Sequence, residues 1–213
     1  MFIEIPPEIL VSVATDSNRM PKLYYHPLKI ARKFFWLRLK YLHELMRGHV
    51  TNWNTCLDFG CGSGVFLPTL SNLFTSVRGI DIEMVEASKI VDYYNLKNVT
   101  LINNDINVAN LDEKSFDVIT AADVLEHFQK IDKPVSQIYR WLKDDGLLLT
   151  SLPTENIFTR LTRIFGKYEK PWDHYHTGME VEEFFHKSGF YKIKSRKVLP
   201  VFPLYLVSVW RKK

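Results

Sequence analysis

The sequence predicts an α/β fold in which a mostly parallel sheet carries helices on both faces. Short apolar runs that favour strands alternate with helical patterns through the middle of the chain, which is typical of βαβ units. The fifth run, 146–152, is apolar enough to be buried on both sides, as strands of parallel sheets are. At 213 residues, with 46% hydrophobic and 24% charged residues, the chain has the length and composition of one globular domain.

Apolar runs with strand character occur through the middle of the chain and again close to its end. The predicted strands are residues 55–59, 77–81, 100–103, 116–121, 146–152, 191–198 and 204–210. The predicted helices are residues 27–47, 65–73, 83–93, 123–129, 133–142 and 179–188. In the first of these helices, apolar residues recur at helical spacing on one side and charged residues lie opposite.

The formal net charge of +4 conceals an uneven distribution of charge along the chain. Residues 1–50 carry +4, residues 51–150 carry −6 and residues 151–213 carry +6. Basic ends are compatible with an anionic membrane surface or nucleic acid as a partner, and equally with an ordinary solvated face. No run approaches the ~20 apolar residues of a transmembrane helix, and the first residues lack the pattern of a secretory signal. We therefore expect a cytoplasmic protein, with peripheral membrane contact left open.

The most specific motif is LDFGCGSG at 57–64, a glycine-rich turn that directly follows the first predicted strand. Glycines let the backbone approach a ligand closely, and the N–H groups of a following helix favour a negative group. A dinucleotide site of the form G-x-G-x-x-G/A needs a small residue where Val65 stands. A P-loop is excluded because no Gly-Lys-Ser/Thr follows. The two cysteines, Cys56 and Cys61, are too few for a disulfide framework or a zinc site.

The motif at 57–64 resembles the first motif of the class I S-adenosylmethionine-dependent methyltransferases. Further matches to this family follow in its usual order: GIDI at 79–82, NDI at 104–106, FDVI at 116–119, EH at 126–127 and LKDDGLL at 142–148. The resemblance covers about residues 54–152 and implies a Rossmann-like, doubly wound sheet of seven strands. The implied strand order is 3-2-1-4-5-7-6, with the last strand antiparallel.

The resemblance also implies how the chain is divided. Residues 1–213 are expected to form a single methyltransferase domain, in which 1–50 is an N-terminal helical extension. Residues 153–177, which are polar and rich in aromatic side chains, are expected to be an insertion on the substrate side. An amphipathic run in this insertion and the helix at 27–47 would cap the substrate pocket, lie on an anionic lipid surface, or simply pack on the sheet.

S-adenosylmethionine is the cofactor that the resemblance implies. Its methionine portion is expected beside Asp58, which would face the ammonium group. The backbone of Gly60 and Gly62 would face the carboxylate of the same portion. Asp123, at the end of the fourth predicted strand, is included among the cofactor-binding residues.

The adenosine portion is expected at the ends of the second and third predicted strands. Asp81 can accept hydrogen bonds from both ribose hydroxyls, and Ile82 would then pack on the adenine face. Asp105 can accept a hydrogen bond from the adenine amino group, with Ile106 covering the ring. Taken alone, Asp81 or Asp105 would equally fit the N-cap of a helix.

Three histidines, His127, His174 and His176, are the predicted catalytic residues, because an imidazole can remove a proton from an acceptor hydroxyl or amine. Asp123, Glu126 and His127 have the spacing i, i+3, i+4, which would place them on one face of a helix. This run resembles the Glu-x-x-Glu-His run that holds magnesium in ubiquinone-biosynthesis O-methyltransferases, and a metal-binding run in small-RNA 2′-O-methyltransferases. The first position here is Asp, and we expect no metal, with Asp123, Glu126 and His127 as the alternative ligand set. Packing or capping is a further interpretation of His127.

The function predicted from these features is methyl transfer from S-adenosylmethionine to a small-molecule or lipid-like acceptor, at oxygen rather than nitrogen or carbon. The resemblance is to the small-molecule and ubiquinone-biosynthesis O-methyltransferase branch. An RNA 2′-O-methyltransferase is an alternative, disfavoured because no basic, aromatic binding module accompanies the motifs. A catalytically silent cofactor-binding scaffold that acts through a partner is the second alternative. The oligomeric state is left open.

Overall fold

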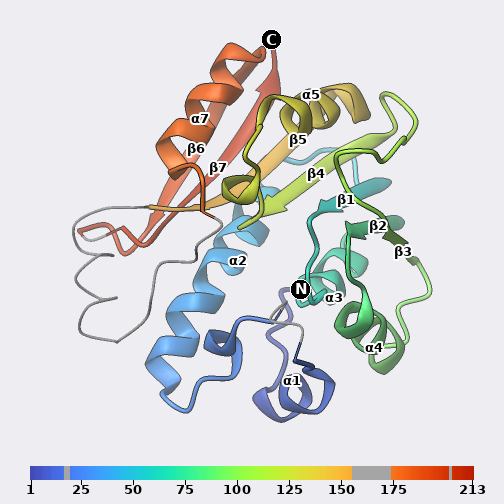
Figure 1. Ribbon diagram of the computed structural model, residues 1–213, viewed down its shortest axis with the longest axis vertical. Coiled ribbons are helices and arrows are strands. Elements are labelled where there is room, and N and C mark those ends of the chain that lie inside the picture. The colour runs from blue at the N-terminus through green and yellow to red at the C-terminus, as the bar shows by residue number, and fades with distance from the viewer. Residues whose placement is uncertain (17–19, 155–173, 202) are drawn as a thin grey trace.

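A single seven-stranded sheet forms the centre of the protein (Figure 1). The structure is a computed structural model that describes residues 1–16, 20–154, 174–201 and 203–213. The strands are β1 (Thr55–Phe59), β2 (Ser76–Asp81), β3 (Val99–Asn103), β4 (Phe116–Ala122), β5 (Leu142–Pro153), β6 (Phe190–Val198) and β7 (Tyr205–Lys212). Their order is β3-β2-β1-β4-β5-β7-β6, and β7 pairs antiparallel with both β5 and β6. The predicted strand order and antiparallel last strand are therefore confirmed.

Helices connect these strands and precede the first of them. The α-helices are α1 (Pro7–Val13), α2 (Lys29–His49), α3 (Leu67–Ser71), α4 (Val85–Tyr93), α5 (Asp132–Trp141) and α7 (Gly178–Lys187). Two short 3-10 helices, η1 (Lys22–Tyr25) and η2 (Leu125–His127), complete the described elements. The helix predicted at 123–129 is wrong, because only the single turn η2 forms there. Most of the predicted insertion, residues 155–173, lies outside the described residues.

The sheet builds two apolar layers, one on each face, as alternation of side chains along a strand requires. Cys56 of β1 belongs to the cluster that includes residues of α1, α2, α3 and α4, whereas Leu57 and Phe59 belong to the cluster with α5 and α7. In Figure 1, α5 and α7 accordingly lie on one side of the sheet and α2 and α3 on the other. The prediction of helices on both faces is thus confirmed.

The amphipathic pattern of α2 is used to pack this helix onto the sheet. Phe35, Trp36, Leu39, Leu42 and Met46 are among its buried side chains. Their burial agrees with the interpretation in which the helix packs on the sheet. No helix within the described residues is long and apolar enough to cross a membrane.

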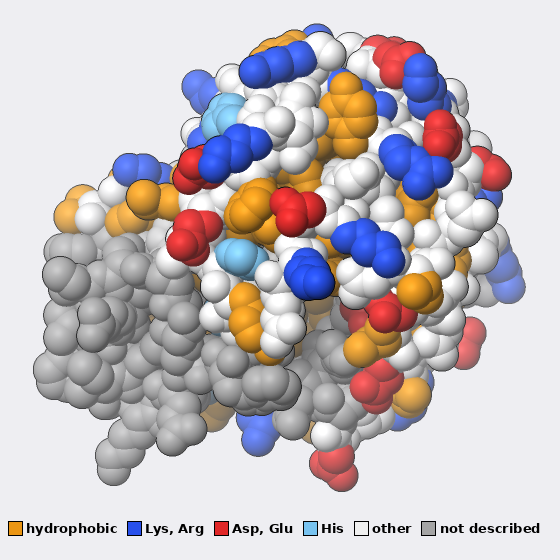
Figure 2. All heavy atoms as spheres, turned by 45° about the horizontal axis from the view of Figure 1, so that its top comes forward, with side chains coloured by type: hydrophobic (Ala, Val, Ile, Leu, Met, Phe, Trp, Pro, Cys, Tyr) orange, Lys and Arg blue, Asp and Glu red, His pale blue; other side chains and the backbone are white. Residues whose placement is uncertain are grey.

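Charged side chains are interspersed on the face of the molecule that carries α5 and α7. Figure 2 shows Lys and Arg side chains beside Asp and Glu side chains over this face, without a separate basic area. Several are paired, as Arg140 is with Glu113 at 2.8 Å and Lys187 with Glu183 at 2.7 Å. Exposed pairs of this kind contribute little to stability.

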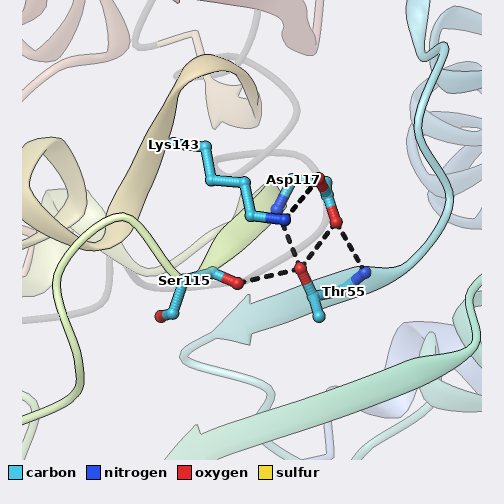
Figure 3. A network of polar contacts seen from close by, with 4 residues as sticks. All are labelled: Thr55, Ser115, Asp117 and Lys143. Atoms are coloured by element: carbon cyan, nitrogen blue, oxygen red, sulfur yellow. Dashed lines mark hydrogen bonds and ion pairs between the residues drawn. The ribbon is translucent and has the colours of Figure 1, made fainter.

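The strands β1 and β4 are tied together at their N-terminal ends by a polar network (Figure 3). Asp117 Oδ2 accepts hydrogen bonds from the Thr55 backbone N–H at 2.8 Å and from the Thr55 hydroxyl at 2.7 Å. Lys143 Nζ lies 2.7 Å from the other carboxylate oxygen of Asp117. Burial alone would raise the pKa of Asp117, but the hydrogen bonds from Lys143 and Thr55 outweigh it and lower the pKa. The network therefore ties β1 to β4 at the edge of the sheet that lies opposite the carboxyl ends of these strands.

Replacing Asp117 with Asn should lower the free energy of unfolding by about 1–3 kcal/mol at neutral pH, because a buried charged acceptor is lost. A carboxylate with a lowered pKa stabilises the fold above its unfolded-state pKa, and this contribution disappears as the pH falls through the folded-state pKa. The difference between the two proteins should therefore shrink below about pH 4. Urea unfolding across this pH range measures it. Asp144→Asn, at an exposed ion pair with Lys114, is the control and should change stability much less.

Candidate functional site

The turn after β1 needs glycine at three positions. Gly60, Gly62 and Gly64 have φ values of +72°, +52° and +76°, in the left-handed region that L-residues rarely adopt. A Cβ on Gly60 would lie 2.2 Å from Val124 Cγ2, and one on Gly64 would lie 2.9 Å from the Cα of Ala87. The backbone of this turn therefore runs in close contact with both the segment after β4 and the helix α4.

Asp81, at the end of β2, holds this turn in place. Its Oδ2 accepts a hydrogen bond from the Gly62 N–H at 2.8 Å, and its Oδ1 accepts one from the Ile82 N–H at 2.8 Å. The Gly60 N–H donates to the carbonyl of Ile80 at 2.9 Å. Each carboxylate oxygen keeps acceptor capacity for a further donor, so the predicted ribose role of Asp81 stays open. The hydrogen bond from the Gly62 N–H to Asp81 was not predicted. It joins the motif at 57–64 to the motif at 79–82, and neither motif alone indicates that their backbones lie so close.

Asp58, in β1, is a buried carboxyl group beside the same turn. It is 4% exposed, and its Oδ1 accepts a hydrogen bond from the Thr120 hydroxyl of β4 at 2.7 Å. Burial raises the pKa of Asp58 to about 6, the hydrogen bond from Thr120 opposes the rise, and the charge of Asp81 adds to it. A cationic group bound here would favour the ionised form of this carboxyl.

The residues predicted to hold an adenine ring differ in how open they are. Ile82 is 54% exposed, whereas Ile106 is 5% exposed and packs in the same core cluster as Ala109. The Asp105 carboxylate is exposed and accepts a hydrogen bond from the Asn107 N–H at 2.8 Å, a local turn contact. Ile82 therefore offers apolar surface for a ring, and the roles of Asp105 and Ile106 stay predictions.

Asp123 does not share a helical face with Glu126 and His127, which corrects the geometry expected from their spacing. Its φ is +54°, so the chain leaves β4 through a left-handed residue instead of entering a helix. Its N–H donates to the carbonyl of Ser151 in β5 at 2.9 Å. Its carboxylate Oδ2 lies 3.0 Å from Nη2 of Arg38, in α2. Arg38 was not among the predicted site residues, because nothing in the local sequence connects α2 to the end of β4.

Two of the predicted histidines meet next to a buried carboxylate. Glu126, His127 and His174 each offer a metal-ligand atom, and these atoms lie within 4.8 Å of one another. The centres of the imidazole rings of His127 and His174 are 4.7 Å apart, and the two rings are nearly perpendicular. The Tyr175 N–H donates to the carbonyl of Glu126 at 2.8 Å, which brings the later segment to the end of β4.

This cluster differs from the predicted histidine and ligand sets in two ways. The ring of His176 packs against the ring of Phe184 in α7, with 5.7 Å between the ring centres. The side chain of His176 is therefore oriented toward that helix. The described residues bring His174, and not Asp123, to Glu126 and His127. One carboxylate and two imidazoles suit a borderline divalent cation, and an imidazole pair also suits proton transfer.

The sequence matches the family described as "Methyltransferase domain" over residues 16–195. The chain belongs to this family. The resemblance to class I S-adenosylmethionine-dependent methyltransferases is thereby confirmed, and the sheet order agrees with it.

Curated relatives of this methyltransferase-family chain carry the name ubiquinone biosynthesis O-methyltransferase. A ubiquinone biosynthesis O-methyltransferase of Paraburkholderia phymatum is 28% identical over 134 residues, covering 61% of this chain and 56% of the relative. The chain spans about half the length of the curated relatives that it matches.

Solved structures share the fold at low identity. The N-methyltransferase NodS of Bradyrhizobium japonicum, in complex with S-adenosylhomocysteine, has a TM-score of 0.69 at 15% identity, covering 96% of each chain. The [4+2]-cyclase SpnF has a TM-score of 0.65 at 15% identity, covering 81% of this chain and 80% of that one. Likeness at this identity supports the fold alone.

Binding of S-adenosylhomocysteine should depend on pH through Asp58. Below about pH 6 its carboxyl is protonated, so binding of a ligand ammonium there has to release a proton. The dissociation constant should rise by up to about tenfold for each pH unit below that value, as calorimetry between pH 5 and about pH 8 can measure.

Two variants make this test specific to Asp58. Asp58→Asn should bind more weakly with little pH dependence. Thr120→Val removes the hydrogen bond that lowers the pKa of Asp58, so the loss of affinity should begin at higher pH. An equally steep pH dependence in Asp58→Asn would contradict the role of this carboxyl.

Proposed function

We propose that this chain transfers the methyl group of S-adenosylmethionine to an oxygen of a small-molecule or lipid-like acceptor. The observation that carries the proposal is the cluster of Glu126, His127 and His174 directly after β4. Val124, in the same segment, occupies the space where a Gly60 side chain would be. The segment that carries Glu126 and His127 therefore packs directly against the glycine turn.

Methyl transfer to a hydroxyl has two requirements: donor and acceptor must be aligned, and the hydroxyl must lose its proton. Methyl transfer is an in-line displacement in which the acceptor oxygen bonds to the methyl carbon while the carbon–sulfur bond breaks. The electron pair of that bond stays on sulfur, so the sulfonium becomes a neutral thioether. Holding donor and acceptor together supplies much of the acceleration. A hydroxyl acceptor must also lose its proton, which an imidazole of His127 or His174 can accept.

An oxygen acceptor is supported by the name of the curated relatives, at 28% identity in the first of them. The fold neighbour NodS is named an N-methyltransferase, so the acceptor atom is decided by experiment. An assay with a methyl-labelled donor and a panel of phenols, catechols, amines and a short RNA tests the atom and the class together. Transfer to RNA alone would favour the RNA alternative, and ligand binding without transfer would favour a silent scaffold.

Replacing His127 or His174 with Ala should lower kcat for a hydroxyl acceptor by about 100-fold or more, since general base catalysis typically contributes that much. The affinity for S-adenosylhomocysteine should change little, because neither imidazole is among the residues assigned to the cofactor. His186→Ala is the matched control, since His186 is an exposed histidine of α7 whose ring lies edge-on to Trp210 and which is not part of this cluster. Full activity in both His127→Ala and His174→Ala would contradict the base role.

Metal removal distinguishes the two uses of the cluster. Because we assign the imidazoles to proton transfer, activity should persist after treatment with EDTA and dialysis, and added Mg²⁺ or Mn²⁺ should not raise it. Activity that disappears with EDTA and returns with one of these ions would instead assign Glu126, His127 and His174 to a divalent cation. The base role would then be withdrawn.

A further inference from the structure

A buried arginine connects α2 to the end of β4. Arg38 is 3% exposed, and its Nη2 lies 3.0 Å from Asp123 Oδ2 and donates to the Tyr24 hydroxyl at 2.7 Å. Asp123 itself retains 21% of its side-chain exposure. The ion pair therefore joins α2, which precedes the first strand, to the residue that directly follows β4.

The surroundings of Arg38 are aromatic and offer little polar compensation. The guanidinium carbon lies 4.2 Å from the ring centre of Phe35 and 5.4 Å from those of Tyr24 and Tyr205. Its Nε has no hydrogen-bond partner in the described part of the chain. A charge in such surroundings is costly unless it is paired, so removing either Arg38 or Asp123 leaves an uncompensated charge behind.

The Tyr24 hydroxyl, which accepts a hydrogen bond from Arg38, is influenced by the charges of two acids, Asp123 and Asp58. Burial raises the pKa of Tyr24 to about 12, Arg38 opposes the rise, and the charges of Asp123 and Asp58 both add to it. Tyr24 is therefore within electrostatic reach of both carboxylates, and Arg38 is paired with one of them, Asp123. Among the described residues, the other buried basic side chain is Lys212, which donates to the carbonyl of Leu142 at the start of β5.

We propose that Arg38 sets the charge at the junction between donor and acceptor, and so determines how strongly the site prefers the cationic cofactor over its neutral product. Arg38 acts as a positioning residue, because it touches Asp123 and Tyr24 and not the reacting atoms. The proposal rests on the proposed function, since it takes S-adenosylmethionine as the donor and S-adenosylhomocysteine as the product.

The sign of the effect follows from the ion pair. With Arg38 in place, the charge of Asp123 is compensated and attracts the sulfonium little. Without Arg38, the unpaired Asp123 carboxylate attracts the sulfonium, so the cofactor binds more tightly relative to the thioether product. Without the Asp123 charge, Arg38 repels the sulfonium and the preference moves the other way. A merely structural role would weaken the binding of both ligands together and leave their ratio unchanged.

Calorimetry with S-adenosylmethionine and with S-adenosylhomocysteine tests this inference in the full-length protein. The quantity compared is the dissociation constant of the product divided by that of the cofactor. Arg38→Met should raise this ratio about fivefold and Asp123→Asn should lower it about fivefold, as expected for one partly screened charge near the sulfonium. Because burial raises the pKa of Asp123 and the charge of Arg38 lowers it, the ratio in Arg38→Met is measured at several pH values up to about pH 9, and it should rise as the Asp123 carboxyl ionises.

Two further variants make the comparison specific. Arg38→Lys keeps the charge and should leave the ratio near that of the unaltered protein, even where both affinities fall because the planar fork is lost. Lys40→Met removes one positive charge from an exposed position of the same helix and should not change the ratio. If Arg38→Met does not fold, as thermal unfolding would reveal, Asp123→Asn and Arg38→Lys carry the test.

Ratios that stay unchanged, or that move in the same direction in Arg38→Met and Asp123→Asn, would overturn the proposal while leaving the proposed function intact. Failure of the unaltered protein to bind either ligand would overturn the proposed function and this inference with it. Opposite shifts in the two variants, together with an unchanged ratio in Lys40→Met, are the supporting result.

Discussion

The left-handed glycine turn after β1 is the constraint on which the rest of the site depends. Because Gly60 and Gly64 have no Cβ, Val124 and Ala87 fill the space beside them, and the segment after β4 and the helix α4 can approach the turn closely. Asp81 then braces the turn through the Gly62 N–H. The sheet brings the carboxyl ends of β1, β2 and β4 to one edge, and the turn determines how closely the segments that follow those ends can pack.

Sequence reasoning succeeded where the signal is local. The strands from β1 to β5 could be predicted from short apolar runs, and Gly60 and Gly62 from their spacing within one motif. The left-handed turn at these glycines is confirmed, and their cofactor roles stay predictions. The two last strands were also found within a few residues, whereas α1 and η1 are too short to leave a periodic pattern.

Contacts between distant segments could not be predicted. The spacing of Asp123, Glu126 and His127 would place them on one face of a helix, but the left-handed Asp123 and its hydrogen bond to Ser151 keep a helix from forming there. His174 reaches the same place only because the backbone after it pairs with Glu126. Neither contact has a signal in the residues that flank it. Arg38 is the clearest example, since a basic residue on an amphipathic helix usually marks the solvated face.

The packing of α2 limits which sequence changes this helix can accept. Two separate contacts fix the orientation of the helix about its own axis. They are the packing of its apolar stripe on the sheet and the buried ion pair of Arg38 with Asp123. Inserting or deleting one residue between Arg38 and Leu39 would rotate the guanidinium by about 100° relative to the apolar residues that follow it. Replacing α2 by a helix from another protein would leave Asp123 unpaired unless the new helix also carries a basic residue at the position of Arg38. Sequence changes in α2 of this chain are therefore constrained by the segment after β4 as well as by the sheet.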